Sequence, residues 1–311
     1  MILAKVLTNR LKKVCLHIIE ENQSAFIPGR GLQEGFAISQ EIIANLHKDK
    51  RSGIILKLDF AKAYDHVKWD FLLQVMTLHG FSANWTRMIK MCVGSAMALV
   101  SINGSICGFF HINRGLRQGD PLSPMLFSLV ANVLSRMCLK AERASWIAGL
   151  PCSNRGTPVT HLQYADDTMV FAEPEEDVLG GYKFILSCFA ILSGLKINWS
   201  KSSLWAINVD ITRVESLVAL VGCELQQAPL KHLGLPLVQR RLLRKDWVPL
   251  VERIEKRLAG WENRCLSSGG RRLISYAADS SGTERIQETS NLTWCNGRIS
   301  RSPEKQVASG F

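Results

Sequence analysis

Apolar residues recur at steps of three and four positions along several stretches of the chain, a spacing typical of amphipathic helices. The pattern predicts helices over residues 1–20, 32–48, 68–79, 178–192 and 246–261. The buried face of the first should comprise Leu3, Val6 or Leu7, Leu11, Val14 and Ile18, and that of the last Trp247, Leu250, Ile254, Leu258 and Trp261. A further long helix is expected to start with Asp120 as its N-cap and Pro121 as its first residue.

Shorter apolar runs predict β-strands. Residues 53–58 form one that opens with glycine and ends at a carboxylate, Asp59, which fits a buried strand. Two more runs, 159–164 and 168–171, are joined by Ala165-Asp166-Asp167. The remaining signals are an Asn-Gly hairpin between residues 98–103 and 105–110, and one short strand over residues 231–238.

Composition and charge narrow the class of protein. The chain has 311 residues, 47% of them hydrophobic and 21% charged, which excludes a disordered or fibrous protein. It carries 38 Lys and Arg against 27 Asp and Glu, a net charge of +11, and residues 231–311 hold 15 of these cations and 8 of the anions. This excess favours a polyanionic partner.

The sequence gives no sign of a membrane or metal-ribbon protein. No apolar run reaches the roughly 20 residues that span a bilayer, and the N-terminus lacks a signal-peptide layout. We therefore expect an intracellular protein, nuclear or cytoplasmic, with no membrane partner. Its nine cysteines include no Cys-x-x-Cys pair, so they are interpreted as reduced thiols.

Three carboxylates are the strongest candidates for chemistry. Asp59 ends a buried strand, and Asp166 and Asp167 lie side by side in a turn between apolar strands. Adjacent carboxylates repel one another, and apolar surroundings raise that cost unless a cation is present. Mg²⁺ prefers such hard oxygen ligands. The alternative is a plain hairpin turn and a strand terminator, because spacing alone does not show that the two sites meet.

Ordered motifs then point to a family. Tyr164-Ala-Asp-Asp167 resembles the YxDD signature of reverse transcriptases. The sequence around it is similar to that of plant-like LINE-type (non-LTR) retrotransposon enzymes. The resemblance covers about residues 1–275, and its other motifs are Asn22–Arg30, Leu58–Asp65 followed by Trp69, Arg114–Pro124, Ser193–Asn198 with Lys201, and Leu233–Pro236.

The resemblance implies an α+β fold: a right-hand polymerase palm, with an antiparallel sheet backed by helices, partial fingers and a helical thumb-like segment. The implied parts are partial fingers (1–50), palm (51–238), a partial thumb-like helix (239–275) and a poorly ordered tail unrelated to the family (276–311). The implied partners are an RNA template, a DNA primer and dNTP. Phosphate and sugar contacts to these partners should dominate, because base pairing reads the template.

The resemblance also assigns roles. Asp59 and Asp166 would hold two Mg²⁺ ions, with Mn²⁺ as an alternative, and Asp167 would be the third acidic residue. The backbone carbonyl of Phe60 would complete the shell of the second ion. The site would catalyse attack of a primer 3′-hydroxyl on a dNTP, through positioning and electrostatics.

Further residues would surround the nucleotide. Tyr64 would lie under the sugar and exclude a 2′-hydroxyl, or else be a core aromatic. Gln118 and Gly119 would lie beside the dNTP and the template base. Lys201, or less readily Lys196, would approach the pyrophosphate, or else be a solvated lysine.

Basic residues are expected to contact nucleic acid. Arg30 would touch a template or nucleotide phosphate, or else stabilise its Pro-Gly turn. Arg253, Lys256 and Arg257 on the helix over 246–261 would follow the duplex backbone, unless that helix is an ordinary packing helix.

The chain also departs from the family pattern. A basic fingers segment and an upstream endonuclease are missing, and the similarity to the family stops near residue 275. We therefore expect a truncated copy. Two functions therefore stay open: a reverse transcriptase domain, or a catalytically silent remnant that binds nucleic acid. An RNA-directed RNA polymerase is a third alternative, against which Tyr64 argues.

Overall fold

The computed structural model describes residues 2–95, 97–152, 156–240, 242–262, 292–295 and 298–301. The chain forms two compact units. Unit 1 comprises residues 1–35, 52–150 and 158–227, and unit 2 comprises residues 36–51, 151–157 and 228–311. All candidate site residues except Arg253, Lys256 and Arg257 belong to unit 1.

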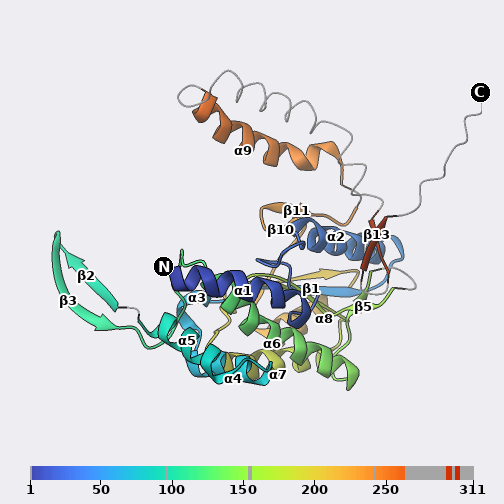
Figure 1. The fold of residues 1–311 in the computed structure, drawn as a ribbon. Helices are drawn as coiled ribbons and strands as arrows, with labels where there is room; N and C mark the ends of the chain where they lie inside the picture. The colour runs from blue at the N-terminus through green and yellow to red at the C-terminus, as the bar shows by residue number, and fades with distance from the viewer. Residues whose placement is uncertain are drawn as a thin grey trace, which may run out of the picture. The chain divides into compact units, whose positions relative to one another are not determined.

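The framework of unit 1 is a five-stranded sheet in the order β6-β7-β1-β8-β9. Figure 1 labels its central strand, β1. The strands pair antiparallel, except that β8 and β9 run parallel. The central strand, β1, is buried at every position but Lys57, as its apolar sequence predicts. The bounds are β1 (Gly53–Leu58), β6 (His161–Tyr164), β7 (Asp167–Ala172), β8 (Ser203–Ile207) and β9 (Glu224–Leu225).

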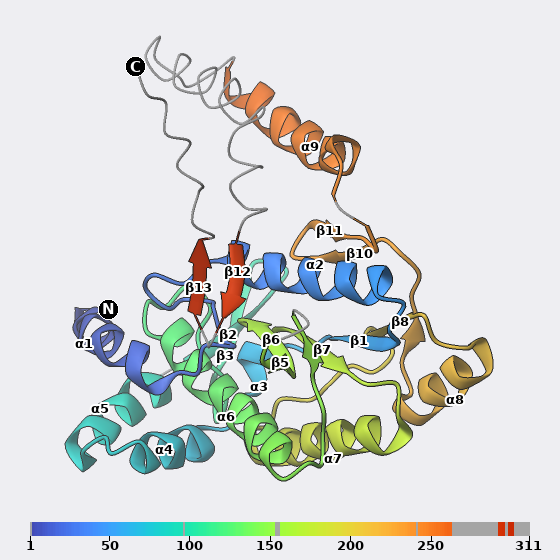
Figure 2. The ribbon, with the colours of Figure 1, turned by 90° about the vertical axis from the view of Figure 1, so that its right-hand side faces the viewer.

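Helices cover one face of this sheet. α6 and α7 pack side by side beneath it and α4 contacts both, while α5 packs on α4 and α8 on α7 (Figure 2). Leu56 of β1, Leu126 of α6 and Phe189 of α7 are each 1% exposed and belong to one core. The bounds are α4 (Trp69–Leu78), α5 (Ala83–Gly94), α6 (Ser123–Arg143), α7 (Glu176–Ser193) and α8 (Ile211–Val221).

Helix α1 (Ile2–Ile18) packs against α6, and its buried face matches the predicted one only at Leu7 and Leu11. Its buried residues are Ala4, Leu7, Thr8, Leu11 and Cys15. Leu3, Val6 and Val14, which we expected to be buried, are between 41% and 45% exposed. The prediction favoured large apolar side chains and overlooked small ones. Thr8 can be buried because its hydroxyl donates to the Ala4 carbonyl at 2.7 Å.

Two local predictions in unit 1 had different outcomes. The Asn-Gly hairpin is confirmed: β2 (Met97–Ile102) pairs with β3 (Ser105–His111), and Asn103 and Gly104 both have positive φ. The helix start at Asp120 is wrong, because α6 begins at Ser123. Asp120 instead accepts a hydrogen bond from the Leu122 amide at 2.8 Å and so stabilises the turn before the helix.

Unit 2 contains most of α2 (Leu32–Lys48), a hairpin of β10 (Leu230–His232) and β11 (Leu235–Leu237), and α9 (Arg244–Glu262). The single strand predicted over residues 231–238 is wrong, because Leu233 and Gly234 adopt positive φ and reverse the chain between β10 and β11. Trp247 of α9 packs edge-on against Phe36 of α2, with ring centroids 6.1 Å apart. Ile254, predicted on the same buried face, is 48% exposed. The side chains of Leu258 and Trp261 lie outside the described residues.

The remaining strands are short: β4 (Leu150–Pro151), β5 (Pro158–Val159), β12 (Leu292–Cys295) and β13 (Arg298–Arg301). β12 and β13 form a hairpin in the segment 276–311, where we expected no regular structure. The rest of that predicted tail lies outside the described residues. Within the described ranges, no helix is both long and apolar enough to cross a membrane.

Candidate active site

Neighbouring strands bring the three predicted carboxylates to one end of the sheet. In the pairing of β1 with β7, Leu58 lies opposite Thr168, so one further step of the same register places Asp59 opposite Asp167. Tyr164 pairs with Asp167, which leaves Ala165 and Asp166 as a two-residue turn between β6 and β7. Positions far apart in the sequence therefore meet, as the hypothesis of a shared site requires.

The charges of these carboxylates act on one another. The pKa of Asp167 is raised, first by burial and then by the negative charges of Asp166 and Asp59, and Lys57 opposes this shift. Asp59, Asp166 and Asp167 are all half-buried. The site is therefore electronegative and accessible to solvent, which favours a cation.

The backbone of Asp59 is held by the segment that follows α7. The Asp59 amide donates to Ser202 Oγ at 3.1 Å, and the Asn198 amide donates to the Asp59 carbonyl at 2.8 Å. Ser202 Oγ in turn donates to the Asn198 carbonyl at 2.8 Å. The predicted motif at residues 193–201 thus positions a carboxylate, a role that the spacing of its residues did not indicate.

Phe60 extends this attachment. It forms a β-bridge with Ile197, and the Ala61 amide donates to the Lys196 carbonyl at 2.9 Å. The Phe60 ring is 8% exposed and meets Phe189 edge-on, with centroids 6.3 Å apart. The side chain therefore belongs to the core, so any ligand role rests with its backbone carbonyl.

The turn that carries Asp166 is held by Gln23, a fully buried residue that the sequence did not single out. Gln23 Oε1 accepts from the Ala165 amide at 3.1 Å, and Gln23 Nε2 donates to the Ala165 carbonyl at 3.3 Å. Ala165 has φ of 58°, which costs an L-residue roughly 1–2 kcal/mol. Two hydrogen bonds of about 1 kcal/mol each are enough to offset that strain.

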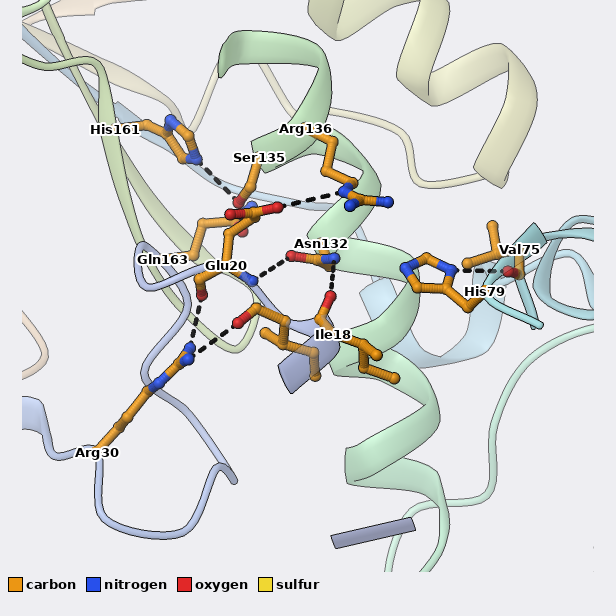
Figure 3. Close-up of polar contacts among 11 residues, drawn as sticks. Ile18, Glu20, Arg30, Val75, His79, Asn132, Ser135, Arg136, His161 and Gln163 are labelled. Atoms are coloured by element: carbon orange, nitrogen blue, oxygen red, sulfur yellow. Dashed lines mark hydrogen bonds and ion pairs between the residues drawn. The ribbon is translucent and has the colours of Figure 1, made fainter. Parts of the chain in front are cut away.

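A buried polar network lies behind the turn, between β6 and α6 (Figure 3). Ser135 Oγ donates to Gln163 Oε1 at 2.9 Å, and His161 Nε2 lies 2.9 Å from the same hydroxyl. Since that hydroxyl proton is directed to Gln163, His161 donates through Nε2 and accepts from Thr160 through Nδ1, at 2.9 Å. Burial lowers the pKa of His161 to about 4, so the ring is neutral and structural, as expected for a lone strand histidine.

Tyr64 lies beside the carboxylates, on the short helix α3 (Ala63–His66). Its ring stacks on Phe127, with centroids 4.8 Å apart and planes 8° apart. Burial and the charge of Asp166 raise its pKa to about 12, so the phenol stays protonated at neutral pH. The ring is only half-buried, which fits both the predicted role against the sugar and the alternative of a core aromatic.

The loop at residues 114–120 is fixed against α3 and α4. The Gly115 amide donates to the Val67 carbonyl at 2.8 Å, and Trp69 Nε1 donates to the Gly115 carbonyl at 2.7 Å. Gly115 has φ of 90°, and a Cβ there would lie 2.7 Å from the Asp65 carbonyl oxygen, so only glycine fits. Gln118 and Gly119 of this loop are exposed.

The structure bears differently on the phosphate contacts predicted for Lys201 and Arg30. Lys201 is exposed, which agrees equally with the pyrophosphate role and with a solvated lysine. Arg30 donates to the carbonyls of Glu20, Gln23 and Ile19 at 2.6, 2.8 and 2.9 Å. Figure 3 shows Arg30 beside Glu20. These bonds favour the structural alternative, in which Arg30 holds the loop that presents Gln23, over a phosphate contact.

The donor chemistry of the three carboxylates fits Mg²⁺ or Mn²⁺, because both prefer oxygen ligands. Their mutual repulsion, seen in the raised pKa of Asp167, would be relieved by such an ion. In the described part of the chain, no group of three His, Cys, Asp or Glu side chains is arranged to hold a metal ion. Ligation by Asp59, Asp166 and Asp167 therefore requires their side chains to turn toward one another.

Unit 2 contains a separate cationic cavity of about 570 Å³ between the β10–β11 hairpin and α9. Its polar and charged lining residues are His47, Lys231, Gln239, Arg240, Lys245, Asp246 and Arg253. Asp246 is engaged by Arg240 through two contacts of 2.7 Å, so the cations are in excess. Of the predicted thumb-like residues, Arg253 lines this cavity, whereas Lys256 and Arg257 are exposed on α9 outside it.

Comparison with known proteins shows the family to which the chain belongs. Residues 2–237 match the family "Reverse transcriptase (RNA-dependent DNA polymerase)". The chain is 30% identical over 280 residues to the transposon TX1 uncharacterized 149 kDa protein of Xenopus laevis, covering 88% of this chain and 21% of that protein. It is 27% identical over 186 residues to the Pol polyprotein of the type-2 retrotransposable element R2DM of Drosophila melanogaster. This match covers 58% of this chain and 16% of that protein.

A solved telomerase has a related fold. The structure from Candida albicans, in complex with a fragment of telomeric RNA, matches with a TM-score of 0.50 and 14% identity, over 81% of this chain and 41% of that one. The α+β polymerase fold predicted from the sequence is thereby confirmed.

The chain belongs to the reverse transcriptase family, and its retrotransposon relatives agree with the LINE-type resemblance. It spans about a fifth of the length of these relatives.

Proposed function

We propose that unit 1 contains the catalytic site of an RNA-directed DNA polymerase palm. The reaction joins the 3′-hydroxyl of a DNA primer to the α-phosphate of a dNTP and releases pyrophosphate. The observation that carries this proposal is the meeting of Asp59, Asp166 and Asp167 at one end of the sheet, with mutual electrostatic repulsion.

The carboxylates have the chemistry to hold the metal ions. Bound Mg²⁺ would supply the positive charge that activates an attacking oxygen and stabilises a leaving one, and Mn²⁺ would take the same ligands. In this proposal Asp59 and Asp166 are the principal ligands and Asp167 is the third acidic residue. The backbone carbonyl of Phe60 offers a further oxygen.

Other residues of unit 1 hold the nucleotide. The half-exposed face of Tyr64 lies under the sugar and excludes a 2′-hydroxyl, because its ring is fixed on Phe127. Gln118 and Gly119 lie beside the nucleotide and the template base, on a loop fixed at Gly115. Lys201 approaches the pyrophosphate from the segment that holds Asp59.

We assign fingers, palm and thumb-like roles to residues 1–50, 51–238 and 239–275. An RNA template and a DNA primer are the macromolecular partners. The cationic cavity of unit 2 supports phosphate contacts by Arg253, and the exposed Lys256 and Arg257 extend that charge along α9. The same cavity favours a second candidate function, which is binding of nucleic acid without catalysis.

Primer extension tests the first function. The purified chain is given an RNA template, a DNA primer, dNTPs and Mg²⁺, and is compared with Asp166→Ala/Asp167→Ala. Asp65→Asn is the matched control, because Asp65 is an exposed carboxylate near the site. We expect extension by the wild type and by Asp65→Asn, and a loss of at least about 100-fold in the double variant.

The assay separates the alternatives. Equal signals from wild type and double variant, or none from either, would exclude catalysis by this chain. Salt-dependent binding of the primer–template by an inactive wild type would leave the second function. A preference for NTP over dNTP would instead support an RNA-directed RNA polymerase and contradict the role of Tyr64.

A further inference from the structure

The turn that carries Asp166 depends on a residue more than 140 positions away in the sequence. Gln23 is 0% exposed, and its carboxamide spans both sides of the Ala165 peptide unit. Its oxygen accepts from the Ala165 amide at 3.1 Å and from the Ala25 amide at 3.0 Å, while its nitrogen donates to the Ala165 carbonyl at 3.3 Å. One planar side chain thus fixes the backbone on both sides of the residue that precedes Asp166.

The loop that presents Gln23 is itself tied to the sheet. The Ser24 amide donates to the Gln163 carbonyl at 3.0 Å, and the Gln163 amide donates to the Asn22 carbonyl at 2.7 Å, so the loop runs parallel to β6. Arg30 Nη1 donates to the Gln23 carbonyl at 2.8 Å. The carboxamide therefore has little freedom to move away from Ala165.

Ala165 needs such support because of its conformation. A β-hairpin turn of two residues usually places glycine, asparagine or aspartate at a positive φ, whereas here alanine has φ of 58°. A strained conformation persists only where neighbouring groups determine it. Relaxation of Ala165 would rotate the peptide that leads to Asp166 and move its carboxylate relative to Asp59.

We infer that Gln23 is a positioning residue for the carboxylate turn: its carboxamide holds Ala165 in the left-handed conformation and thereby fixes the backbone from which the Asp166 carboxylate projects. The inference rests on the proposed function for its catalytic consequence, but not for its structural one. Gln23 itself touches no reacting group.

Gln40 offers a matched control within the same chain. Its Nε2 donates to the Val238 carbonyl at 2.8 Å and its Oε1 accepts from the Val238 amide at 3.1 Å, which is the same two-sided contact. Gln40 and Val238 belong to unit 2 and carry no predicted catalytic role. Gln23→Met therefore removes a two-sided backbone contact beside the carboxylates, and Gln40→Met removes one away from them.

The first measurement is amide hydrogen exchange at Ala165 in the full chain, which needs neither substrate nor activity. We expect exchange at least tenfold faster in Gln23→Met and unchanged in Gln40→Met. Gln23→Glu keeps the acceptor but loses the donor, so its exchange should be intermediate, and it replaces Gln23→Met if that variant fails to fold. Unchanged exchange at Ala165 in the Gln23 variants would overturn the inference.

The second measurement separates positioning from stability. Mn²⁺ affinity, followed by electron paramagnetic resonance, should fall at least tenfold in Gln23→Met and stay within twofold in Gln40→Met. In primer extension, kcat should fall while KM for dNTP stays within twofold. Faster exchange with unchanged Mn²⁺ affinity and kcat would overturn the positioning role. Absence of extension by the wild type would instead defeat the proposed function, and exchange and Mn²⁺ affinity would still decide the inference.

Discussion

At the scale of single residues, the cluster of carboxylates works against folding. Asp167 has a raised pKa because it is half-buried and lies near Asp166 and Asp59. An acid whose folded pKa is raised destabilises the folded state once it ionises, so stability is lost as pH rises from the ordinary value of 3.8 through the folded value. Such a cost is common at sites that later receive a cation.

Asp167→Asn should therefore stabilise the protein at neutral pH. The amide keeps the shape of the side chain and removes the repelled charge. Because Asp167 is half-exposed, solvent screening keeps the gain at or below about 1 kcal/mol, or about 2–4 °C in Tm. Thermal unfolding without divalent ions should show the gain at pH 7 and none below pH 3.8. Asp65→Asn, at an exposed carboxylate, is the control, and an equal gain in both variants would contradict the explanation.

At the scale of elements, the site depends on loops that are fixed by glycine. Gly115 and Gly119 lie in the same loop and both have positive φ, at 90° and 84°. They differ in what a Cβ would meet: at Gly115 it would lie 2.7 Å from the Asp65 carbonyl oxygen, whereas at Gly119 nothing lies within 4 Å. Substitutions at these two glycines therefore distinguish the cost of a strained backbone from the cost of a steric clash.

We predict that Gly115→Ala destabilises the protein much more than Gly119→Ala. Both substitutions incur the cost of a left-handed alanine, about 1–2 kcal/mol. Only Gly115→Ala also forces the loop away from α3 and breaks the bonds with Val67 and Trp69, which adds about 1–3 kcal/mol. Denaturant unfolding of both variants measures the difference in the free energy of unfolding, and equal losses would show that the close contact with Asp65 is relieved at no cost.

Several elements of unit 1 could be predicted from the sequence, because their signals are local, whereas α5, α8, β8 and β9 were not predicted. The run that ends at Asp59, the turn at Asp166-Asp167 and the Asn-Gly hairpin each depend on a few adjacent residues. The buried face of α1 could be predicted only at Leu7 and Leu11, because the face also contains Ala4 and Thr8, which a search for large apolar side chains overlooks.

The supports of the site were also missed, for a different reason. Gln23 holds Ala165 and Ser202 holds Asp59 across more than 140 residues of chain, and nothing in their spacing indicates a contact. Within the motif that contains Gln23, the sequence analysis assigned a role only to Arg30, whose charge indicated a phosphate contact. The structure shows that charge directed at three backbone carbonyls instead.

At the scale of the whole molecule, charge is divided between the two units. The three candidate carboxylates lie in unit 1, whereas the cationic cavity lies in unit 2, within the region that holds most of the excess of +11. Such a division agrees with the proposed polymerase function, in which metal ions would bind at the anionic site and phosphates at the cationic one. It also makes a prediction about salt that does not require catalysis.

Binding of a primer–template duplex should weaken steeply with salt. The logarithm of the affinity falls linearly with the logarithm of salt concentration, by about 0.9 for each phosphate that a cation contacts. Arg253→Gln should therefore reduce the magnitude of this slope by about 1, because Arg253 lines the cavity. Lys48→Gln is the matched control, since Lys48 is an exposed cation of unit 2 outside the cavity lining. Fluorescence anisotropy between about 50 and 300 mM NaCl measures both slopes, because such affinities change by orders of magnitude over this range. If Arg253→Gln and Lys48→Gln leave the same slope, the cavity does not bind phosphate, and the cationic excess of unit 2 serves another purpose.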